Sequence, residues 1–409
     1  MDYELIAPCH FGLESVLKRE VQALGYTITK VEDGKVRFLT DEAGIARANI
    51  FLRTAERVLL LAAEFDAYTF DELFEQTKAV PWARFLPKDA RFWVKKANSV
   101  RSRLFSPSDI QSIVKKAIVE NLKAAYGTEI LPESGDEYPI RISILKDRVT
   151  VGIDTSGDSL HKRGYRRDTV KAPITETLAA ALLMLTPWKP DRILVDPFCG
   201  SGTFLIEAAL MAKNEAPGMN RSFTAEKWRN LVPKKCWYEG VTEAMDLLRK
   251  PPSGLDLQGY DIDPAAVRSA KENAARAEAE DLIHFETRDV RNLSHRKKYG
   301  FIVTNPPYGE RISEKEALPE LYRVLGERFA ALDAWSMYMI TSYEDAPAMV
   351  GREPARNRKI YNGMLKTYFY EFPGPKPPKA RTAGEDGAGQ GRRAETEGER
   401  DGNHRRDRK

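Results

Sequence analysis

The chain has 409 residues, which is enough for two or three domains of ordinary size. Hydrophobic residues make up 42% and charged residues 30%, a composition that supports packed cores. No apolar run approaches the roughly 18 residues that a membrane-spanning helix needs. The N-terminal stretch MDYELIAPCH lacks the basic and apolar regions of a signal peptide. These features argue against a membrane protein, and the cytoplasm is the expected compartment.

The net charge of +4 lies mostly near the C-terminus. From Lys376 onward, ten Lys and Arg face seven Asp and Glu, a net charge of +3. Global charge therefore does not indicate nucleic-acid binding, and any RNA surface must be a local patch. Cys9, Cys199 and Cys236 lie far apart without metal-ligand spacing, so we expect neither a disulfide framework nor a metal site.

Residues 1–65 predict a small α+β unit. The pattern indicates a strand at 3–8, a helix at 12–24 that stops at Gly25, and strands at 27–31 and 35–39, followed by a second helix. The Asp33-Gly34 pair between the two later strands is a strong hairpin signal.

A second α+β unit is expected at 66–157. It should contain a helix near 70–77, a strand at 91–96, a helix at 108–126, and strands at 138–145 and 148–154. Basic residues cluster among serines in this unit, at Lys95, Lys96, Arg101, Arg103 and Lys115. Such a face suits contacts with an RNA backbone, although a solvated helix face and strand edge would have the same composition.

Residues 158–372 alternate between strands and helices, which is typical of a parallel sheet with crossover helices. Strands are expected at 192–195, 256–261, 282–286, 301–304 and 335–341, with an antiparallel pair at 358–361 and 366–372. Residues 373–409 contain almost no apolar side chains, so we expect a disordered, charged tail.

The first chemical motif is Asp196-Pro197-Phe198-Cys199-Gly200-Ser201-Gly202-Thr203, between a predicted strand and helix. The glycines would let the backbone approach a nucleotide-like ligand. A dinucleotide dehydrogenase would show GxGxxG with an acid about 20 residues later, and this chain does not. An acid before the glycines instead suits the amino group of S-adenosylmethionine.

Two further acidic positions follow predicted strands. Asp261 could accept both ribose hydroxyls of the cofactor, whereas Asp263, before Pro264, suits a helix N-cap. Asp289 could meet the adenine amino group, although an exposed turn acid would look the same. The full set of expected cofactor-binding positions here is Asp196, Pro197, Gly200, Gly202, Thr203, Asp261, Ile262, Asp289, Val290 and Asn305.

The fourth motif, Asn305-Pro306-Pro307-Tyr308, follows the apolar strand 301–304. An exocyclic amine is a poor nucleophile, and two acceptors on its N–H bonds, the Asn305 side-chain oxygen and the Pro306 carbonyl, could orient its lone pair. Tyr308 offers a stacking face for a base taken out of its helix. Asn305, Pro306 and Tyr308 are therefore the candidate catalytic residues. Carbon-5 methylation of a pyrimidine needs a nearby thiolate, and no cysteine follows Cys236, so direct transfer to nitrogen is favoured.

At this point the sequence resembles the THUMP-domain class I methyltransferases related to the N-terminal half of the bacterial 23S rRNA guanine-N2 methyltransferase. The resemblance covers nearly all of residues 1–372. Its most specific stretches are HKRGYR at 161–166, the ten residues from Ala172 to Ala181, DPFCGSGTFLIEAAL, EAPG at 215–218 and NPPYGERI at 305–312.

The resemblance implies an α/β fold in which a Rossmann-like methyltransferase domain follows ferredoxin-like and THUMP domains. It also implies that Ala172, Pro173 and Thr177 line the cofactor pocket, and that Arg163 and Arg166 join the RNA-binding residues. S-adenosylmethionine is the implied cofactor and RNA the implied partner, with rRNA preferred to tRNA. No metal is implied, and no pattern indicates the oligomeric state.

Competing hypotheses remain open at this point. The NPPY motif also suits N6-methylation of adenine in DNA or N5-methylation of a protein glutamine. A tRNA guanine could be the acceptor, or the chain could be a non-catalytic RNA-binding factor with a vestigial cofactor fold.

Overall fold

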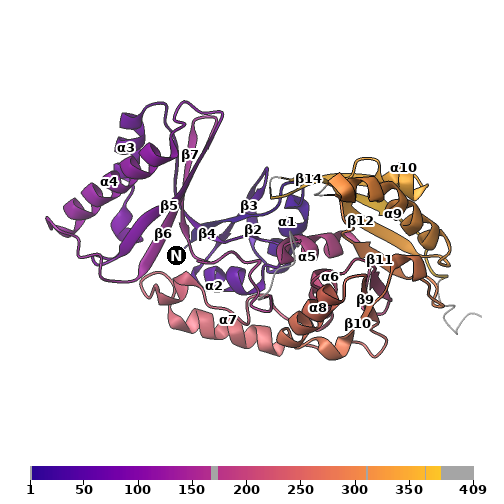
Figure 1. Cartoon of the computed structure of the whole chain (residues 1–409). Helices are drawn as coiled ribbons and strands as arrows, with labels where there is room; N and C mark the ends of the chain where they lie inside the picture. Colours follow the sequence, from indigo (N-terminus) through magenta and orange to yellow (C-terminus); the bar gives the residue numbers. More distant parts are fainter. Residues whose placement is uncertain (1, 167–173, 310–311, 364, 379–409) are drawn as a thin grey trace, which may run out of the picture. The chain divides into compact units, whose positions relative to one another are not determined.

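A computed structural model describes residues 2–166, 174–309, 312–363 and 365–378. These residues contain two seven-stranded sheets (Figure 1). The residues predicted to form a disordered tail lie, from 379 onward, outside the described part of the chain.

The first sheet has the order β2-β3-β1-β4-β7-β6-β5. Its strands are β1 (Tyr3–Pro8), β2 (Thr27–Glu32), β3 (Lys35–Thr40), β4 (Leu59–Asp66), β5 (Arg91–Val100), β6 (Glu137–Leu145) and β7 (Arg148–Asp154). Its helices are α1 (Glu14–Ala23), α2 (Glu42–Phe51), α3 (Phe70–Ala79), the 3-10 turn η1 (Trp82–Arg84) and α4 (Pro107–Tyr126). Lys146 and Asp147 have φ of 51° and 64°, the left-handed conformation that a tight β6–β7 hairpin requires.

Strand β4 joins the two predicted N-terminal units into one sheet. It pairs with β1 through Leu60 and Leu5, and with β7 along its whole length. The sequence analysis did not predict this strand, because LLLAAEFD lacks the alternation of polar and apolar residues that marks a half-buried strand. The proposed domain boundary between residues 65 and 66 falls one residue before the end of β4.

The second sheet has the order β10-β9-β8-β11-β12-β14-β13. Its strands are β8 (Leu194–Asp196), β9 (Leu257–Asp261), β10 (Ile283–Thr287), β11 (Phe301–Thr304), β12 (Ser336–Thr341), β13 (Arg356–Asn362) and β14 (Leu365–Phe372). The first five strands in this order are parallel, and β14 runs antiparallel to β12 and β13, as the sequence predicted. Parallel strands bring the carboxyl ends of β8, β9, β10 and β11 to one edge of the sheet.

Helices cover both faces of the second sheet (Figure 1). They are α5 (Glu176–Leu185), α6 (Thr203–Ala212) and α8 (Pro264–Arg276) on one side, and α9 (Ile312–Ala330) and α10 (Ala346–Val350) on the other. Short 3-10 turns are η3 (Glu280–Leu282) and η4 (Val290–Asn292). Neighbouring residues in one strand enter opposite cores, as Ile302 and Val303 do, which explains the continuous apolar strands.

The segment between α6 and β9 packs on the first sheet although it is continuous in sequence with the second. It contains η2 (Thr224–Lys227) and α7 (Lys234–Asp246). The Trp228 ring stacks on Tyr138 at 4.6 Å between centroids, and Arg47 of α2 donates to Glu243 at 2.6 Å and 2.7 Å. Residues 216–244 therefore stabilise the N-terminal sheet.

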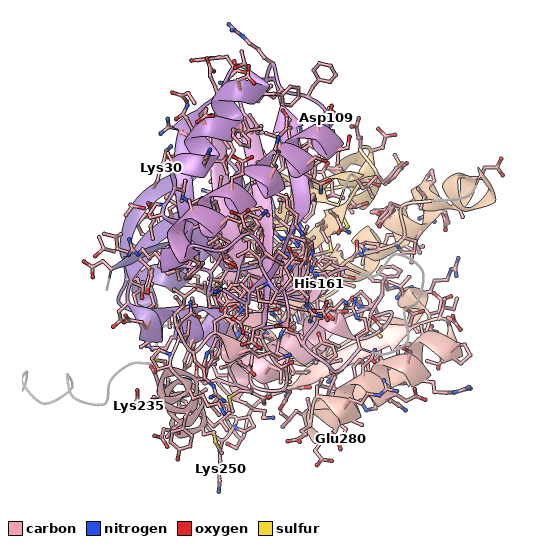
Figure 2. The ribbon with its side chains drawn as sticks, turned by 90° about the vertical axis from the view of Figure 1, so that its left-hand side faces the viewer. Lys30, Asp109, His161, Lys235, Lys250 and Glu280 are labelled. Atoms are coloured by element: carbon pink, nitrogen blue, oxygen red, sulfur yellow. The ribbon has the colours of Figure 1, made fainter. Side chains whose placement is uncertain are left out.

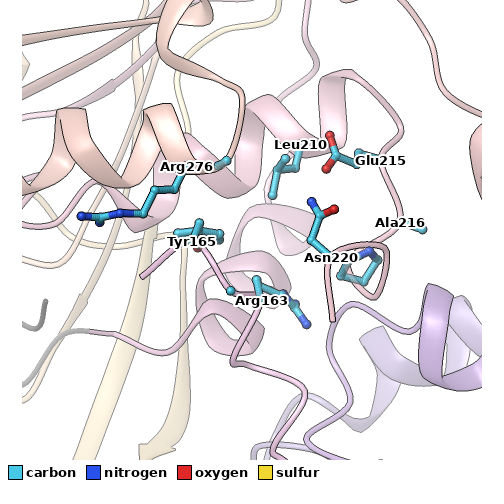
Figure 3. Close-up of a pocket in the computed structure, with 10 residues that line it drawn as sticks. Arg163, Tyr165, Leu210, Glu215, Ala216, Asn220 and Arg276 are labelled. Carbon is cyan, nitrogen blue, oxygen red and sulfur yellow. The ribbon is translucent and has the colours of Figure 1, made fainter. Parts of the chain in front are cut away.

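A buried ion cluster connects the N-terminal part to α6. Glu207 is 0% exposed and pairs with Arg53 at 3.2 Å and with Arg163 at 3.5 Å. Beside it, EAPG at 215–218 packs against α2, where Gly218 N–H donates to the Ile50 carbonyl at 2.9 Å. A small pocket lies here between Arg163, Tyr165, Glu215 and Arg276 (Figure 3).

No helix among the described residues is long and apolar enough to cross a bilayer.

Candidate active site

The glycine loop connects β8 to α6. Gly200 and Gly202 have φ of 51° and 82°, which favours glycine at both positions. A Cβ on Gly202 would also lie 2.9 Å from the Phe285 ring. Asn273 of α8, which is 0% exposed, donates its amide to the Ser201 carbonyl at 3.1 Å. Contacts with α8 and β10 therefore hold the glycine loop in its conformation.

Asp261 lies at the end of β9 and contacts this loop directly. Its Oδ2 accepts from Gly200 N–H at 2.9 Å and its Oδ1 accepts from Asp263 N–H at 3.0 Å. Burial raises the pKa of Asp261. Asp263 caps α8 by accepting from Ala265 N–H at 2.8 Å, as predicted. Each oxygen of Asp261 keeps lone-pair capacity for further donors such as ribose hydroxyls.

Asp196 is 2% exposed at the end of β8, and burial raises its pKa to about 7. Its Oδ1 accepts from the Thr304 hydroxyl at 2.6 Å and from Phe198 N–H at 3.1 Å. Thr304 is the last residue of β11, directly before Asn305. The two motifs are therefore joined by one hydrogen bond, a role for Thr304 that the sequence analysis missed.

The NPPY loop follows β11. Asn305 and Tyr308 are half-buried, Pro306 is buried and Pro307 is exposed. Neither proline can donate an N–H, so the loop presents carbonyl acceptors. The Pro307 carbonyl accepts from the Tyr322 hydroxyl of α9 at 3.0 Å. Tyr322 gave no signal in the sequence beyond its apolar character in a helix.

The remaining cofactor positions differ in their surroundings. Asp289, at the start of η4, accepts from the backbone N–H of Arg291 and from its guanidinium, each at 2.8 Å. Val290 is buried, whereas Ile262 is 67% exposed beside Asp261. Pro197 and Thr203 flank the glycine loop, and Ala172 and Pro173 lie outside the described residues.

Thr177 belongs to a polar cluster at the start of α5. Its hydroxyl donates to Glu56, whose other oxygen lies 3.3 Å from Nδ1 of His161. His161 is labelled near the centre of Figure 2. His10 Nε2 lies 3.2 Å from Glu56 Oε1, and its Nδ1 lies 3.0 Å from the Tyr361 carbonyl. The side-chain bonds from His10 and His161 hold the pKa of Glu56 well below its usual range despite burial. The cluster fixes α5 against the N-terminal sheet.

The basic residues predicted to contact RNA do not form one patch. Lys95, Arg101 and Arg103 are exposed, and Arg103 lies over the Tyr68 ring at 4.8 Å. Lys115 pairs with Glu133 on the helix-covered side of the sheet. Lys96 lies on the opposite face, because a β-bulge between Val94 and Lys96 interrupts the alternation that places Phe92 and Val94 in the core.

The structure corrects the assignment of Arg163 and Arg166. Arg163 is 4% exposed and donates to the Leu160 and Arg53 carbonyls. The Arg166 guanidinium donates to the Ile174 carbonyl at 2.9 Å and to Thr203 Oγ1 at 2.6 Å. Both guanidinium groups are hydrogen-bonded to protein groups in the interior, so neither belongs to the RNA surface.

A groove of about 390 Å³ crosses the open face of the first sheet. Lys96, Arg141 and Gly152 lie in register on β5, β6 and β7, and the adjacent row is Asn98, Ser143 and Thr150. In-register residues share a face, so cations and neutral polar groups line the floor together. The groove also reaches Lys35 and Arg57, and Glu56 of the polar cluster is among the residues that line it.

The site fits S-adenosylmethionine. Two carboxylates flank the glycine loop, and no described heavy atom lies within 4 Å of the point where a Cβ on Gly200 would stand. Ile262 leaves an apolar surface uncovered next to Asp261, which suits a purine face. Among the described residues, no group of three or more His, Cys, Asp or Glu is arranged to hold a metal.

Comparison with known proteins identifies the family. A model of the RMKL-like methyltransferase domain matches residues 163–371, one of the RlmL ferredoxin-like domain matches 4–59, and one of the THUMP domain matches 67–154. A putative RNA methyltransferase of Bacillus subtilis is 47% identical over 372 residues, covering 90% of this chain and 96% of that protein.

Two further proteins bear on activity and cofactor. The ribosomal RNA large subunit methyltransferase K/L of a Marinomonas species is 33% identical over 390 residues, covering 91% of this chain and 53% of that protein. This chain thus spans about half the length of that relative. A solved putative methyltransferase complexed with SAH is 40% identical, with a TM-score of 0.87, covering 92% of this chain and 99% of that one. The chain belongs to the RMKL-like methyltransferase family, and its cofactor is S-adenosylmethionine.

Proposed function

We propose that this RNA methyltransferase modifies the exocyclic N2 of a guanine in 23S rRNA by direct transfer. The hydrogen bond between Thr304 and Asp196 carries the proposal, because it holds the acceptor loop beside the cofactor loop. The THUMP match and the names of the relatives support RNA as the substrate. The choice of guanine and of the large-subunit RNA follows the resemblance to the K/L enzymes.

Bound S-adenosylmethionine supplies a methyl group carried on a positively charged sulfur. Asp196 would face its ammonium group, Asp261 would accept from its ribose hydroxyls, and Asp289 would lie near its adenine. The Asn305 side-chain oxygen and the Pro306 carbonyl accept the two N–H bonds of the guanine amine and aim its lone pair. Tyr308 stacks on the flipped base. Aligning the amine in this way removes much of the entropic barrier.

Direct transfer requires no thiolate nucleophile. Cys199 is the one cysteine in the glycine loop; it is 5% exposed, and burial raises its pKa far above the usual value. A thiol of this kind stays protonated and unreactive. The chemistry therefore rests on the polar acceptors of the NPPY loop.

The groove on the first sheet is the proposed path of the RNA backbone. Lys96 would pair with phosphates, as would Arg141 while its Nε stays bonded to Asp154 at 2.8 Å, and Asn98 and Ser143 would donate to phosphate or sugar oxygens. Glu56 lines the groove and is bonded to Thr177, which the family resemblance assigns to the cofactor pocket, so a strand lying in the groove would lead toward the site.

The decisive experiment uses tritiated S-adenosylmethionine with four acceptors: rRNA and tRNA from a strain lacking the gene, DNA, and a peptide release factor. Label in rRNA, mapped by nucleoside mass spectrometry to N2-methylguanosine, is expected. Label in tRNA, DNA or the release factor would replace the substrate with that acceptor. Absence of transfer to all four would leave the non-catalytic RNA-binding factor as the better hypothesis.

Asn305→Ala tests the chemistry. We expect turnover to be lost while the cofactor dissociation constant, measured by calorimetry, stays within about twofold, because this side chain acts on the amine. Asn357→Ala, an exposed asparagine on β13, is the matched control and should keep wild-type turnover. Turnover by Asn305→Ala at the wild-type rate would disprove the assigned role.

A further inference from the structure

Tyr322 lies beneath the NPPY loop and is 0% exposed. Its hydroxyl is 3.0 Å from the Pro307 carbonyl oxygen and 2.6 Å from Thr341 Oγ1. Thr341, also 0% exposed, is the last residue of β12, the strand next to β11. The hydroxyl of this α9 residue thus contacts both β12 and the loop that follows β11.

The direction of each hydrogen bond in this group follows from its chemistry. The Pro307 carbonyl can only accept, so the single proton of Tyr322 must point to it. The Thr341 hydroxyl must then donate to the Tyr322 oxygen. The Thr341 oxygen in turn accepts from the backbone N–H of Tyr343 at 3.1 Å. Each hydroxyl donates once and accepts once, so the chain Tyr343, Thr341, Tyr322, Pro307 has one consistent proton arrangement.

This chain determines which acceptors the loop can offer. With the Pro307 carbonyl engaged by Tyr322, the peptide plane between Pro307 and Tyr308 is held in one orientation. The Asn305 side-chain oxygen and the Pro306 carbonyl are left to face an amine. A rotation of that peptide plane changes ψ of Pro307 and φ of Tyr308, so it would turn the Tyr308 ring and distort the loop that carries the Pro306 carbonyl.

We propose that Tyr322 is a positioning residue for methyl transfer, and that its hydroxyl, oriented by Thr341, sets the geometry of the NPPY loop. The inference rests on the proposed function of Asn305 and Pro306. Tyr322 itself does not touch the substrate. Its contribution is to hold two acceptors in the orientation that the amine needs before the RNA arrives.

The test compares Tyr322→Phe with Tyr338→Phe in the full chain. Tyr338 is a matched control, because it is 2% exposed, lies on β12 and packs in the core on the other side of the sheet. The assay uses tritiated cofactor and rRNA from a strain lacking the gene. For Tyr322→Phe we expect kcat to fall by about tenfold or more, with KM for rRNA and the cofactor dissociation constant within about twofold. Tyr338→Phe should keep the wild-type kcat.

A second pair of variants covers the case in which Tyr322→Phe folds poorly. Thr341→Val removes the donor that orients the Tyr322 proton and should lower kcat in the same way, whereas Thr341→Ser keeps the hydroxyl and should restore it. A wild-type kcat in Tyr322→Phe or in Thr341→Val would overturn the proposal, as would a loss in Thr341→Ser as large as in Thr341→Val.

The two proposals fail in different ways. If the wild-type protein labels no RNA, or Asn305→Ala still turns over, the proposed function itself is wrong. If the wild type labels RNA and Asn305→Ala is inactive while Tyr322→Phe is normal, only the role of Tyr322 is wrong.

Discussion

The Thr304 hydroxyl donates to Oδ1 of Asp196 across 2.6 Å, with both residues almost fully buried. The bond joins the strand that leads into the acceptor loop to the strand that leads into the cofactor loop. Parallel pairing of β8 and β11 brings the two strand ends together, and the hydroxyl then fixes the carboxylate. We therefore expect cofactor binding and acceptor geometry to be coupled at this point.

Thr304→Val should weaken cofactor binding. The substitution keeps the shape but removes a donor from a buried carboxylate, which costs about 1–3 kcal/mol when the acceptor is left unsatisfied. We expect the dissociation constant for S-adenosylmethionine, measured by calorimetry, to rise by about fivefold or more. Thr27→Val, at an exposed position on β2 of the first sheet, is the control and should bind normally. Unchanged affinity in Thr304→Val would show that the bond does not support the cofactor site.

Cofactor affinity should rise with pH through about 7, because that is the pKa of Asp196 and only its ionised form attracts an ammonium group. Below this pH the carboxyl must lose a proton on binding, which lowers the apparent affinity. Calorimetry across the range should show this dependence in the wild type. Asp196→Asn cannot ionise, so it should bind more weakly and with a flat profile. An equally steep profile in Asp196→Asn would assign the titration to another group.

Because burial raises the pKa of Asp196, ionisation of this carboxyl lowers the free energy of unfolding. A carboxyl whose folded pKa is raised contributes stability below its unfolded pKa of 3.8, and this contribution is lost as pH rises through about 7. The loss amounts to roughly 4 kcal/mol at most. Asp196→Asn should therefore gain stability relative to the wild type as pH rises. This gain is measured in urea as an increase in the variant's free energy of unfolding over that of the wild type. A difference independent of pH would contradict the assignment.

Gly202→Ala should destabilise the protein and distort the cofactor loop. The residue has φ of 82°, and a Cβ would meet the Phe285 ring at 2.9 Å and Ala270 at 3.1 Å. Backbone strain of this kind costs on the order of 1–3 kcal/mol. Gly254→Ala is the matched control, because it has ordinary φ and no described atom within 4 Å of the new Cβ. Equal midpoints of thermal unfolding for the two variants would count against a special role for Gly202.

Glu207→Gln should destabilise the link between the N-terminal part and α6. Its carboxylate, 0% exposed, faces Arg53 and Arg163, and removing one partner of a buried ion pair costs about 3–5 kcal/mol. Glu239→Gln breaks an exposed pair with Lys235 and should change the free energy of unfolding by about 0.5 kcal/mol or less. Urea unfolding of both variants gives the comparison, and similar small losses would mean that the cluster adds little.

Lys96→Ala should weaken rRNA binding and reduce its salt dependence. Each lost phosphate contact lowers the slope of log K against log salt by about one. Lys235→Ala on α7 is the control, since its side chain is 79% exposed and lies outside the groove. Filter binding at several salt concentrations measures both quantities. A salt slope equal to that of the wild type would remove the groove from the proposed RNA path.

The sequence alone determined the class of fold and the class of enzyme, a methyltransferase. Apolar strands followed by glycine, acidic and NPPY motifs predicted a parallel sheet with an antiparallel pair, and the comparisons confirm the family and cofactor. These motifs can be recognised in the sequence because each consists of a few consecutive residues. The roles of the individual site residues and the domain boundaries stay predictions.

Only the tertiary structure decided how distant segments meet. Strand β4 unites the N-terminal units, and residues 216–244 leave their own sheet to pack on the other. The tertiary structure also shows that Arg163 and Arg166 lie in the interior and not on the proposed RNA surface. Lys96 and Lys115 lie on opposite faces of the first sheet. Hydrogen bonds such as Thr304 to Asp196 and Tyr322 to Pro307 join residues far apart in sequence, so no periodicity or motif predicts them.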